Sequence, residues 1–188
     1  QDESVLRNDG GGVFTKLPLT GSGGDSGAVA WGDYDNDGDF DGLAANDTGG
    51  NEVLLRNDGG VLSTFTLTGT GGNSMGVAWG DADGDGDLDV MVANGGGQNE
   101  AYLGNDGGVL NLMFIGGSGG DSKAVAWGDY DSDGDLDVLV ANAGGEDEFV
   151  LRNNGLGGFV KLVVPKSGGD SVAASWGDID KDGDMDAV

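Results

Sequence analysis

The chain has 188 residues, with 42 glycines, 2 prolines and no cysteine, and its 34 acidic against 8 basic residues give a net charge of −26. The few Lys and Arg residues are scattered and form no basic patch, which disfavours nucleic acid and anionic membrane surfaces as partners. The longest apolar stretch is far shorter than the roughly 20 residues that span a bilayer, so we expect no membrane insertion. The glycines lack a three-residue period and predict many tight turns between short strands.

The chain start and the cysteine content say little about the cellular compartment. Residues 1–4 lack the basic and apolar regions of a signal peptide, so any targeting segment is expected to have been removed or to lie outside this sequence. Without cysteine, disulfides cannot report on the compartment, although a fold held by metal ions can do without them in a secreted setting.

Four tryptophans mark a repeated unit, because they recur at spacings of 48, 48 and 49 residues in the same local context: Trp31, Trp79, Trp127 and Trp176. In chain order, residues 1–24 match the third and fourth strands of a repeat. Residues 25–72, 73–120 and 121–169 follow as complete repeats, and residues 170–188 match the first and second strands. We expect these segments to form a single domain over residues 1–188.

Each complete repeat predicts four strands. The first is an apolar segment such as 28–33, which leads into an acidic loop, and the second is an apolar run such as 90–93. The third, such as 53–56, stops at Asn57-Asp58-Gly59-Gly60, residues that suit a hairpin turn. The fourth, 62–67, alternates apolar and hydroxyl side chains, as expected of a half-exposed outer strand.

These elements predict an all-β fold, since no stretch has a sustained period of 3.6 residues and the glycines disfavour helix. Four-stranded antiparallel units of this length are typical of a β-propeller. We expect four blades per chain, with a closing blade composed of both termini. About six residues are missing between the two halves of that blade, so strand pairing would join them.

Each predicted first strand leads into a nine-residue loop with aspartate at positions 1, 3, 5, 7 and 9 and glycine at position 6. Clustered carboxylates repel one another by about 1 kcal/mol per pair at 4 Å in water, so a cation is the implied partner. The candidate metal ligands are Asp33, Asp35, Asp37, Asp39 and Asp41; Asp81, Asp83, Asp85, Asp87 and Asp89; Asp129, Asp131, Asp133, Asp135 and Asp137; and Asp178, Asp180, Asp182, Asp184 and Asp186.

The spacing favours Ca²⁺, with one ion per repeat and about four per chain. Side-chain oxygens at positions 1, 3, 5 and 9 and a backbone carbonyl at position 7 suit a cation that takes six to eight oxygen ligands. Zinc or copper would require His or Cys, which this sequence lacks, and Mg²⁺ prefers a smaller octahedron. Two other interpretations remain open: solvated Asp-Gly turns without metal, and an ion that only locks the first strand to the second.

Two better-known calcium motifs do not fit. An EF-hand needs a bidentate Glu at position 12, where the first three loops have Ala44, Val92 and Val140, and its flanks are helices. A calcium β-roll repeats its nine-residue motif back to back, whereas here each loop occurs once per repeat.

The Val-Ala-Trp-Gly-Asp strand, the Asp-x-Asp-x-Asp-Gly-Asp-x-Asp loop and the Leu-Arg-Asn-Asp-Gly continuation together resemble the FG-GAP or VCBS repeat, found in the integrin α-subunit propeller and in some propeller lectins. The resemblance covers the whole chain. It implies Ca²⁺ held by the side chains of Asp33, Asp35, Asp37 and Asp41 and the carbonyl of Asp39. Propellers of this family more often have seven or eight blades, so a four-bladed ring, a homodimer completing an eight-bladed ring and part of a longer propeller all remain open.

The leading functional hypothesis is a non-enzymatic extracellular or cell-surface module for binding or adhesion, with a glycan or protein as ligand. The alternatives are a purely structural repeat of a larger surface protein and, less favoured, a glycan-active enzyme. No His or Cys is present, and Glu52, Glu100 and Glu148 recur as a structural position. The Gly-Asp-Ser segments before the first strands, such as 24–26, are interpreted as turns or as the lining of pockets between blades.

Overall fold

The computed structural model describes residues 2–188, and these residues form strands, turns and loops without a helix. The predicted all-β class is therefore confirmed. Within residues 2–188, no helix has the length and apolar character needed to cross a membrane.

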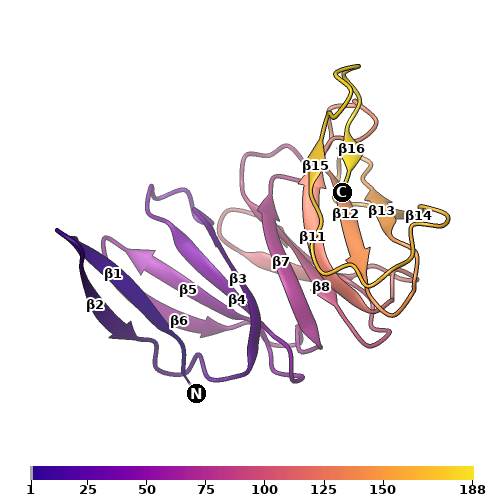
Figure 1. The fold of residues 1–188 in the computed structure, drawn as a ribbon. Helices are drawn as coiled ribbons and strands as arrows, with labels where there is room; N and C mark the ends of the chain where they lie inside the picture. Colours follow the sequence, from indigo (N-terminus) through magenta and orange to yellow (C-terminus); the bar gives the residue numbers. More distant parts are fainter. Residues whose placement is uncertain (1) are drawn as a thin grey trace.

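Three complete four-stranded antiparallel sheets form the body of the molecule (Figure 1), and each follows chain order from its first to its fourth strand. The first sheet contains β3 (Ser26–Gly32), β4 (Asp41–Asn46), β5 (Val53–Asp58) and β6 (Val61–Thr66). The second contains β7 (Ser74–Gly80), β8 (Asp89–Asn94), β9 (Ala101–Asn105) and β10 (Leu110–Phe114). The third contains β11 (Ser122–Gly128), β12 (Asp137–Asn142), β13 (Phe149–Arg152) and β14 (Val160–Val163).

Burial follows the order of the strands within each sheet. Every residue of β4, β8 and β12 is buried, because these second strands have a strand on either side and a sheet packed on their faces. The fourth strands are largely exposed, and β6 is a half-exposed outer strand as predicted, although its half-buried residues, 62–64, are consecutive and do not alternate with exposed ones. The first strand of each complete sheet has a β-bulge near its start, between Ser26 and Ala28 in the first sheet and at the matching positions of the other two.

Two shorter sheets lie at the ends of the row. The N-terminal one pairs β1 (Ser4–Gly10) with β2 (Val13–Pro18), and the C-terminal one pairs β15 (Trp176–Gly177) with β16 (Asp186–Ala187). Figure 1 shows them at opposite ends of the fan of sheets, and they belong to separate sheets. The composite closing blade is thus not formed within this chain in the structure, because the three complete sheets hold its two halves apart, and a closed ring stays a prediction.

The hydrophobic core lies between neighbouring sheets. One cluster joins Tyr34, Leu43 and Leu54 of the first repeat to Val90 and other buried residues of the second. Another joins Met91 and Tyr102 of the second repeat to Phe149 and Leu151 of the third. Each sheet therefore depends on the next one for burial, as expected of a repeat protein.

Three of the four tryptophans, Trp79, Trp127 and Trp176, pack between neighbouring sheets. Gly32, Gly80 and Gly128 lie under Trp79, Trp127 and Trp176 of the next repeat, and a Cβ added at Gly80 would come within 2.8 Å of the Trp127 ring. The indole Nε1 of Trp127 donates to the carbonyl of Ala78 at 3.2 Å, and Trp176 makes the matching bond to Ala126 at 3.0 Å. Glycine at these positions is thus required by the closeness of the indole.

Buried glutamates provide a second link between sheets. Ser74, the first residue of β7, donates its hydroxyl to Glu52 Oε1 of the preceding repeat at 2.5 Å, and Ser122 donates to Glu100 in the same way. Both glutamates have no exposed surface, and burial raises the pKa of each. These serines therefore serve the packing of one sheet on the next, and the glutamates hold the structural position that the sequence indicated.

Candidate metal centres

The four acidic loops occupy one equivalent place in every repeat, the connection from the first strand to the second. They join β3 to β4, β7 to β8, β11 to β12 and β15 to β16. Each loop begins directly after the Trp-Gly pair, and its ninth position starts the second strand or, in the last repeat, β16. The sheets thus hold both ends of every loop at a fixed separation.

Two residues of each loop adopt the left-handed backbone conformation, and this coils the loop around its centre. Position 6 is glycine throughout, with φ between 92° and 98°. Position 4 is Gly84 in the second loop, with φ of 75°, but Asn36, Ser132 and Lys181 occupy it elsewhere, with φ of 57°, 57° and 66°. Left-handed φ costs most non-glycine residues about 1 kcal/mol or more, so the loop geometry is maintained against a local preference.

The first aspartate of each loop organises the turn. Asp33 Oδ1 accepts the backbone N–H of Asp37 at 3.1 Å, and its Oδ2 accepts that of Gly38 at 3.0 Å. Asp129 accepts the matching N–H groups of positions 5 and 6, whereas Asp81 and Asp178 accept those of positions 4 and 6, at distances between 2.6 and 3.1 Å. These bonds fix the carboxylate of position 1 against the backbone of the same loop.

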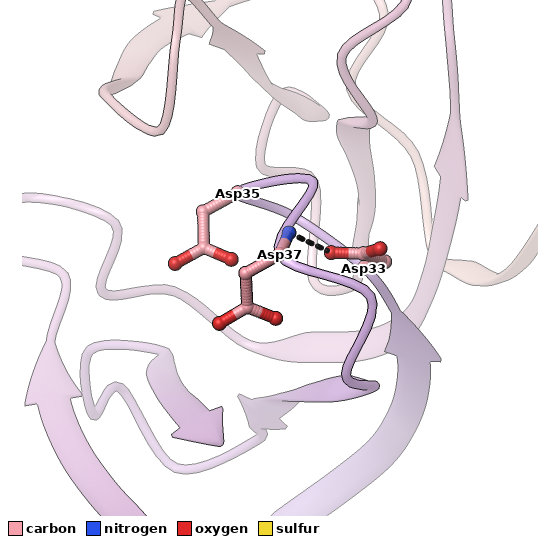
Figure 2. A group of neighbouring side chains, drawn as sticks. All are labelled: Asp33, Asp35 and Asp37. Atoms are coloured by element: carbon pink, nitrogen blue, oxygen red, sulfur yellow. Dashed lines mark hydrogen bonds between the residues drawn. The ribbon is translucent and has the colours of Figure 1, made fainter. Parts of the chain in front are cut away.

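Carboxylate oxygens converge in every loop, with one oxygen from each of three aspartates lying within 4.8 Å of the others. Figure 2 shows Asp33, Asp35 and Asp37 of the first loop gathered in this way. The converging positions are 1, 3 and 5 in the first two loops and 1, 3 and 9 in the last two. The sets are Asp33, Asp35 and Asp37; Asp81, Asp83 and Asp85; Asp129, Asp131 and Asp137; and Asp178, Asp180 and Asp186.

The aspartate at position 9 anchors the loop to the sheet. Asp89 is fully buried, its Oδ2 accepts the backbone N–H of Ala82 at 2.8 Å, and its Oδ1 accepts that of Asn105 at 2.7 Å. Asp41 and Asp137 are bound alike, and burial raises the pKa of all three carboxyls. Position 9 therefore has a structural role whether or not it also binds a cation.

The aspartate at position 7 directs its side chain away from the centre of the loop. Asp39 Oδ2 accepts the backbone N–H of Gly59 at 2.6 Å, and Asp87 Oδ2 accepts that of Gly107 at 2.7 Å, so both hold the turn after the third strand. This leaves the backbone carbonyl, the atom that the sequence analysis assigned, as the ligand that position 7 can offer. The side chains of Asp133 and Asp182, at position 5, each accept the N–H of position 7 at 3.0 Å.

An arginine from the third strand reaches position 3 in two of the loops. Arg56 Nε lies 3.0 Å from Asp35 Oδ2, and Arg152 lies 3.9 Å from Asp131 Oδ2. The matching residue of the second repeat is Gly104, so Asp83 has no such neighbour. The sequence shows the recurrence of these arginines, but not that they contact the loops.

The loops fit a hard divalent cation. Their donors are carboxylate and carbonyl oxygens, the ligand type that Ca²⁺ takes. Asp35 Oδ1 is buried and has no hydrogen-bond donor among residues 2–188, although Oδ2 of the same carboxylate lies beside Arg56. A buried carboxylate oxygen without a partner costs roughly 1–3 kcal/mol, which a bound cation would offset.

Asparagines at the end of the third strand complete the loop surroundings, and the residue types and spacing within the loops do not predict them. Asn105 Nδ2 donates to the carbonyl of Tyr34 in the preceding loop at 2.6 Å, and Asn153 does the same to Ala82. Each partner lies 71 residues away in the chain. The signal that could have indicated them is the constant spacing of 16 residues from position 9 to the asparagine.

The fold and these loops define an all-β repeat protein with one acidic hairpin loop per repeat. The family model for the FG-GAP-like repeat matches residues 81–140 and 129–188, more than half of the chain, and the chain belongs to this family. Each match begins at the first aspartate of an acidic loop and includes the following loop. No curated protein matches the sequence.

Proposed function

We propose that this chain is a calcium-binding β-propeller module in which each acidic loop holds one Ca²⁺, about four per chain. The observation that carries the proposal is the fourfold recurrence of three carboxylate oxygens within 4.8 Å at the same place in every repeat. Asp33, Asp35, Asp37 and Asp41, with the carbonyl of Asp39, form the ligand set of the first loop, and the matching residues form the others. The ion supplies positive charge that offsets the repulsion between these carboxylates.

The row of sheets supports the propeller. The first strands β3, β7 and β11 contact one another in sequence, and the second, third and fourth strands of each sheet follow from them in chain order. Small residues such as Ala28, Ala30 and Gly32 suit a crowded inner strand. The acidic loops then lie at the same end of every sheet, where Ca²⁺ locks the first strand to the second.

The role that we propose for the module is non-enzymatic binding or adhesion outside the cell, with a glycan or protein as ligand. Loops of this kind suit the millimolar calcium of extracellular fluid. The acids outside the loops give little support to an enzyme, because Glu52 and Glu100 have no exposed surface on which to meet a substrate. Membership of the FG-GAP-like repeat family agrees with this role.

Calorimetric titration with Ca²⁺ tests the proposed sites. We expect about four ions to bind each chain, and Asp83→Asn, which removes one charge from the converging set of the second loop, to weaken one of the four. Asp106→Asn, a matched change at an exposed turn residue outside the loops, is expected to leave all four unchanged. The absence of calcium uptake by the parent chain would contradict the proposal.

A glycan array probed in calcium buffer and again in chelator tests the proposed role. Binding that requires Ca²⁺ supports a lectin-like module, and binding to a protein partner instead would appear in pull-down with cell-surface protein ectodomains. Hydrolysis of an arrayed glycan would contradict the non-enzymatic role while leaving the calcium sites unaffected.

A further inference from the structure

An asparagine followed by glycine is the dipeptide in which a side-chain amide reacts most readily with the next backbone nitrogen, because glycine has no side chain to hinder the approach. The chain contains two such dipeptides, Asn94-Gly95 and Asn154-Gly155. Asn94 ends β8 and is 1% exposed, whereas Asn154 is exposed in the turn between β13 and β14. The structure thus places the same chemical group in two different surroundings.

The side-chain amide of Asn94 is held through both of its polar atoms. Its Nδ2 donates to the carbonyl of Asn99 at 2.9 Å, and its Oδ1 accepts the Ser74 hydroxyl at 2.8 Å. The backbone N–H of Gly95 donates to the carbonyl of Asn73 at 2.8 Å. The nitrogen that would attack and the amino group that would leave are therefore both engaged in hydrogen bonds.

The side-chain amide of Asn154 has the opposite arrangement. Its Oδ1 accepts two backbone N–H groups, that of Leu156 at 3.1 Å and that of Gly158 at 3.0 Å. Neither its Nδ2 nor the backbone N–H of Gly155 donates a hydrogen bond to any group of residues 2–188. The attacking nitrogen and the leaving amino group are therefore free, and only the carbonyl oxygen is held.

Two backbone donors on one carbonyl oxygen favour attack at its carbon. They draw electron density away from Asn154 Cγ, and they are in place for the negative charge that the oxygen acquires when a nucleophile adds. Donors at about 2.7–3.1 Å stabilise such an oxyanion in hydrolytic enzymes. Gly158 permits this approach, since a Cβ added there would come within 2.6 Å of Asn154 Nδ2. The turn therefore activates the amide that it contains.

We propose that Asn154 is a site of spontaneous modification, where the folded protein deamidates through a cyclic imide formed with Gly155. The backbone N–H of Gly155 loses its proton to a solvent base, and the nitrogen forms a bond to Asn154 Cγ. The bond from Cγ to Nδ2 then breaks, and the amino group takes a proton from solvent and leaves as ammonia. Water opens the imide ring at either carbonyl, which yields aspartate or isoaspartate at this position.

The aspartate product gives the third repeat the turn residue of the first two, which have Asp58 and Asp106 where the third has Asn154. Arg56 lies 2.8 Å from Asp58, whereas the matching Arg152 has a neutral amide at that position of its own repeat. Deamidation to aspartate therefore supplies the carboxylate with which the arginine of the first repeat already pairs. The isoaspartate product instead lengthens the backbone of the turn.

Peptide mapping by mass spectrometry tests the proposal on the whole folded chain, incubated at neutral pH in calcium buffer. We expect the mass increase of an amide-to-acid change to accumulate at Asn154, with aspartate and isoaspartate both present. The rate at Asn94 is expected to be roughly tenfold lower or less, because its reaction requires local opening of the sheet. In guanidinium chloride the two dipeptides are equally exposed and are expected to react at comparable rates, with Asn154 no faster than in the folded chain.

Asn154→Asp is the matched control, and it is expected to remove the mass increase from this turn while the rest of the peptide map stays unchanged. The proposal would be overturned by a folded chain in which Asn154 stays unmodified, reacts no faster than Asn94, or reacts more slowly than in guanidinium chloride. Aspartate formed without isoaspartate would also overturn it, because opening of the imide ring yields both. None of these outcomes depends on whether the acidic loops bind Ca²⁺.

Discussion

Arg56 and Asp35 show that one position of the acidic loop does not have the same surroundings in every repeat. The guanidinium of Arg56 lies 3.0 Å from Asp35 Oδ2 in the first loop, whereas the second loop has Gly104 in place of the arginine. A cation bound to the first loop must share that carboxylate with a positive side chain. The loops therefore need not bind Ca²⁺ with equal affinity.

We predict that Arg56→Gln raises the calcium affinity of the first loop. The arginine is partly exposed, so solvent screens its charge, and the dissociation constant for Ca²⁺ is expected to fall by a factor of roughly two to five. Calorimetric titration of the variant measures it. Lys16→Gln is the control, because Lys16, on the outer strand β2, forms no ion pair with a loop carboxylate among the described residues. Equal affinities for both variants and the parent would contradict a direct effect of Arg56.

Glu52 offers a second test at this scale, because it is a buried carboxyl outside the acidic loops. Burial raises its pKa, and the hydrogen bonds from Ser74 and Thr70 lower it to a smaller extent. The folded state therefore holds the proton more tightly than the unfolded chain. The contribution to stability is fully present below the unfolded pKa near 4.3 and is lost as the pH rises through the higher folded value.

We predict that Glu52→Gln stabilises the protein at neutral pH and that this advantage shrinks toward zero as the pH falls below about 4. The amide keeps an oxygen to accept the Ser74 hydroxyl without placing a charge in the core. Melting temperatures of the variant and the parent, compared over a pH series in chelator, measure the difference. Asp106→Asn, at an exposed residue, is expected to show no such trend. A variant that is less stable than the parent at pH 7 would contradict the prediction.

At the scale of the elements, the contact between the first strand and the indole of the next repeat decides how closely the sheets approach. A Cβ at Gly80 would lie 2.8 Å from Trp127, which a packed interface cannot accept without shifting the ring. The hydrogen bond from Trp127 Nε1 to the carbonyl of Ala78 also holds that ring in place. The interface therefore has little freedom to adapt.

We predict that Gly80→Ala lowers the free energy of unfolding by roughly 1–3 kcal/mol. Denaturant unfolding followed by tryptophan fluorescence measures this. Gly116→Ala is the matched control, since a Cβ there meets nothing within 4 Å, and it is expected to change the free energy of unfolding by less than about 0.5 kcal/mol. Equal stability of the two variants would show that the interface relaxes around the added methyl group.

The strands were predictable from the sequence because their signals are local. The recurrence of Trp31 and its equivalents located the first strands, and the apolar run 90–93 located β8, which extends one residue further at each end. The convergence of three aspartates per loop follows from a spacing that is also local. Local patterns in the sequence therefore predict the fold class and the aspartate clusters, but not the contacts between repeats.

Contacts between repeats depend on how the sheets pack, and no local pattern records that. The bond from Asn105 to Tyr34 joins residues 71 positions apart, and the approach of Arg56 to Asp35 depends on the path of β5 beside the loop. The predicted closing blade illustrates the same limit. The sequence predicts its two halves as partial repeats of two strands each, and the structure has them as two separate two-stranded sheets.

At the scale of the whole molecule, stability is divided among repeats that each bury apolar surface against their neighbours and each carry a dense cluster of like charge. With 34 acidic and 8 basic residues, the chain repels itself most strongly at the acidic loops. A cation in each loop would reduce that repulsion and tie the first strand of every sheet to the second. Calcium and folding are then linked in all four repeats.

Thermal unfolding in calcium buffer and in chelator tests this linkage most directly. Each site adds about 2.7 kcal/mol at a hundredfold excess of Ca²⁺ over its dissociation constant. Several occupied sites are therefore predicted to raise the melting temperature by roughly 10 °C or more in a chain of this size. Superimposable melting curves in the two buffers would contradict the account, because the acidic loops would then be stable without a bound ion.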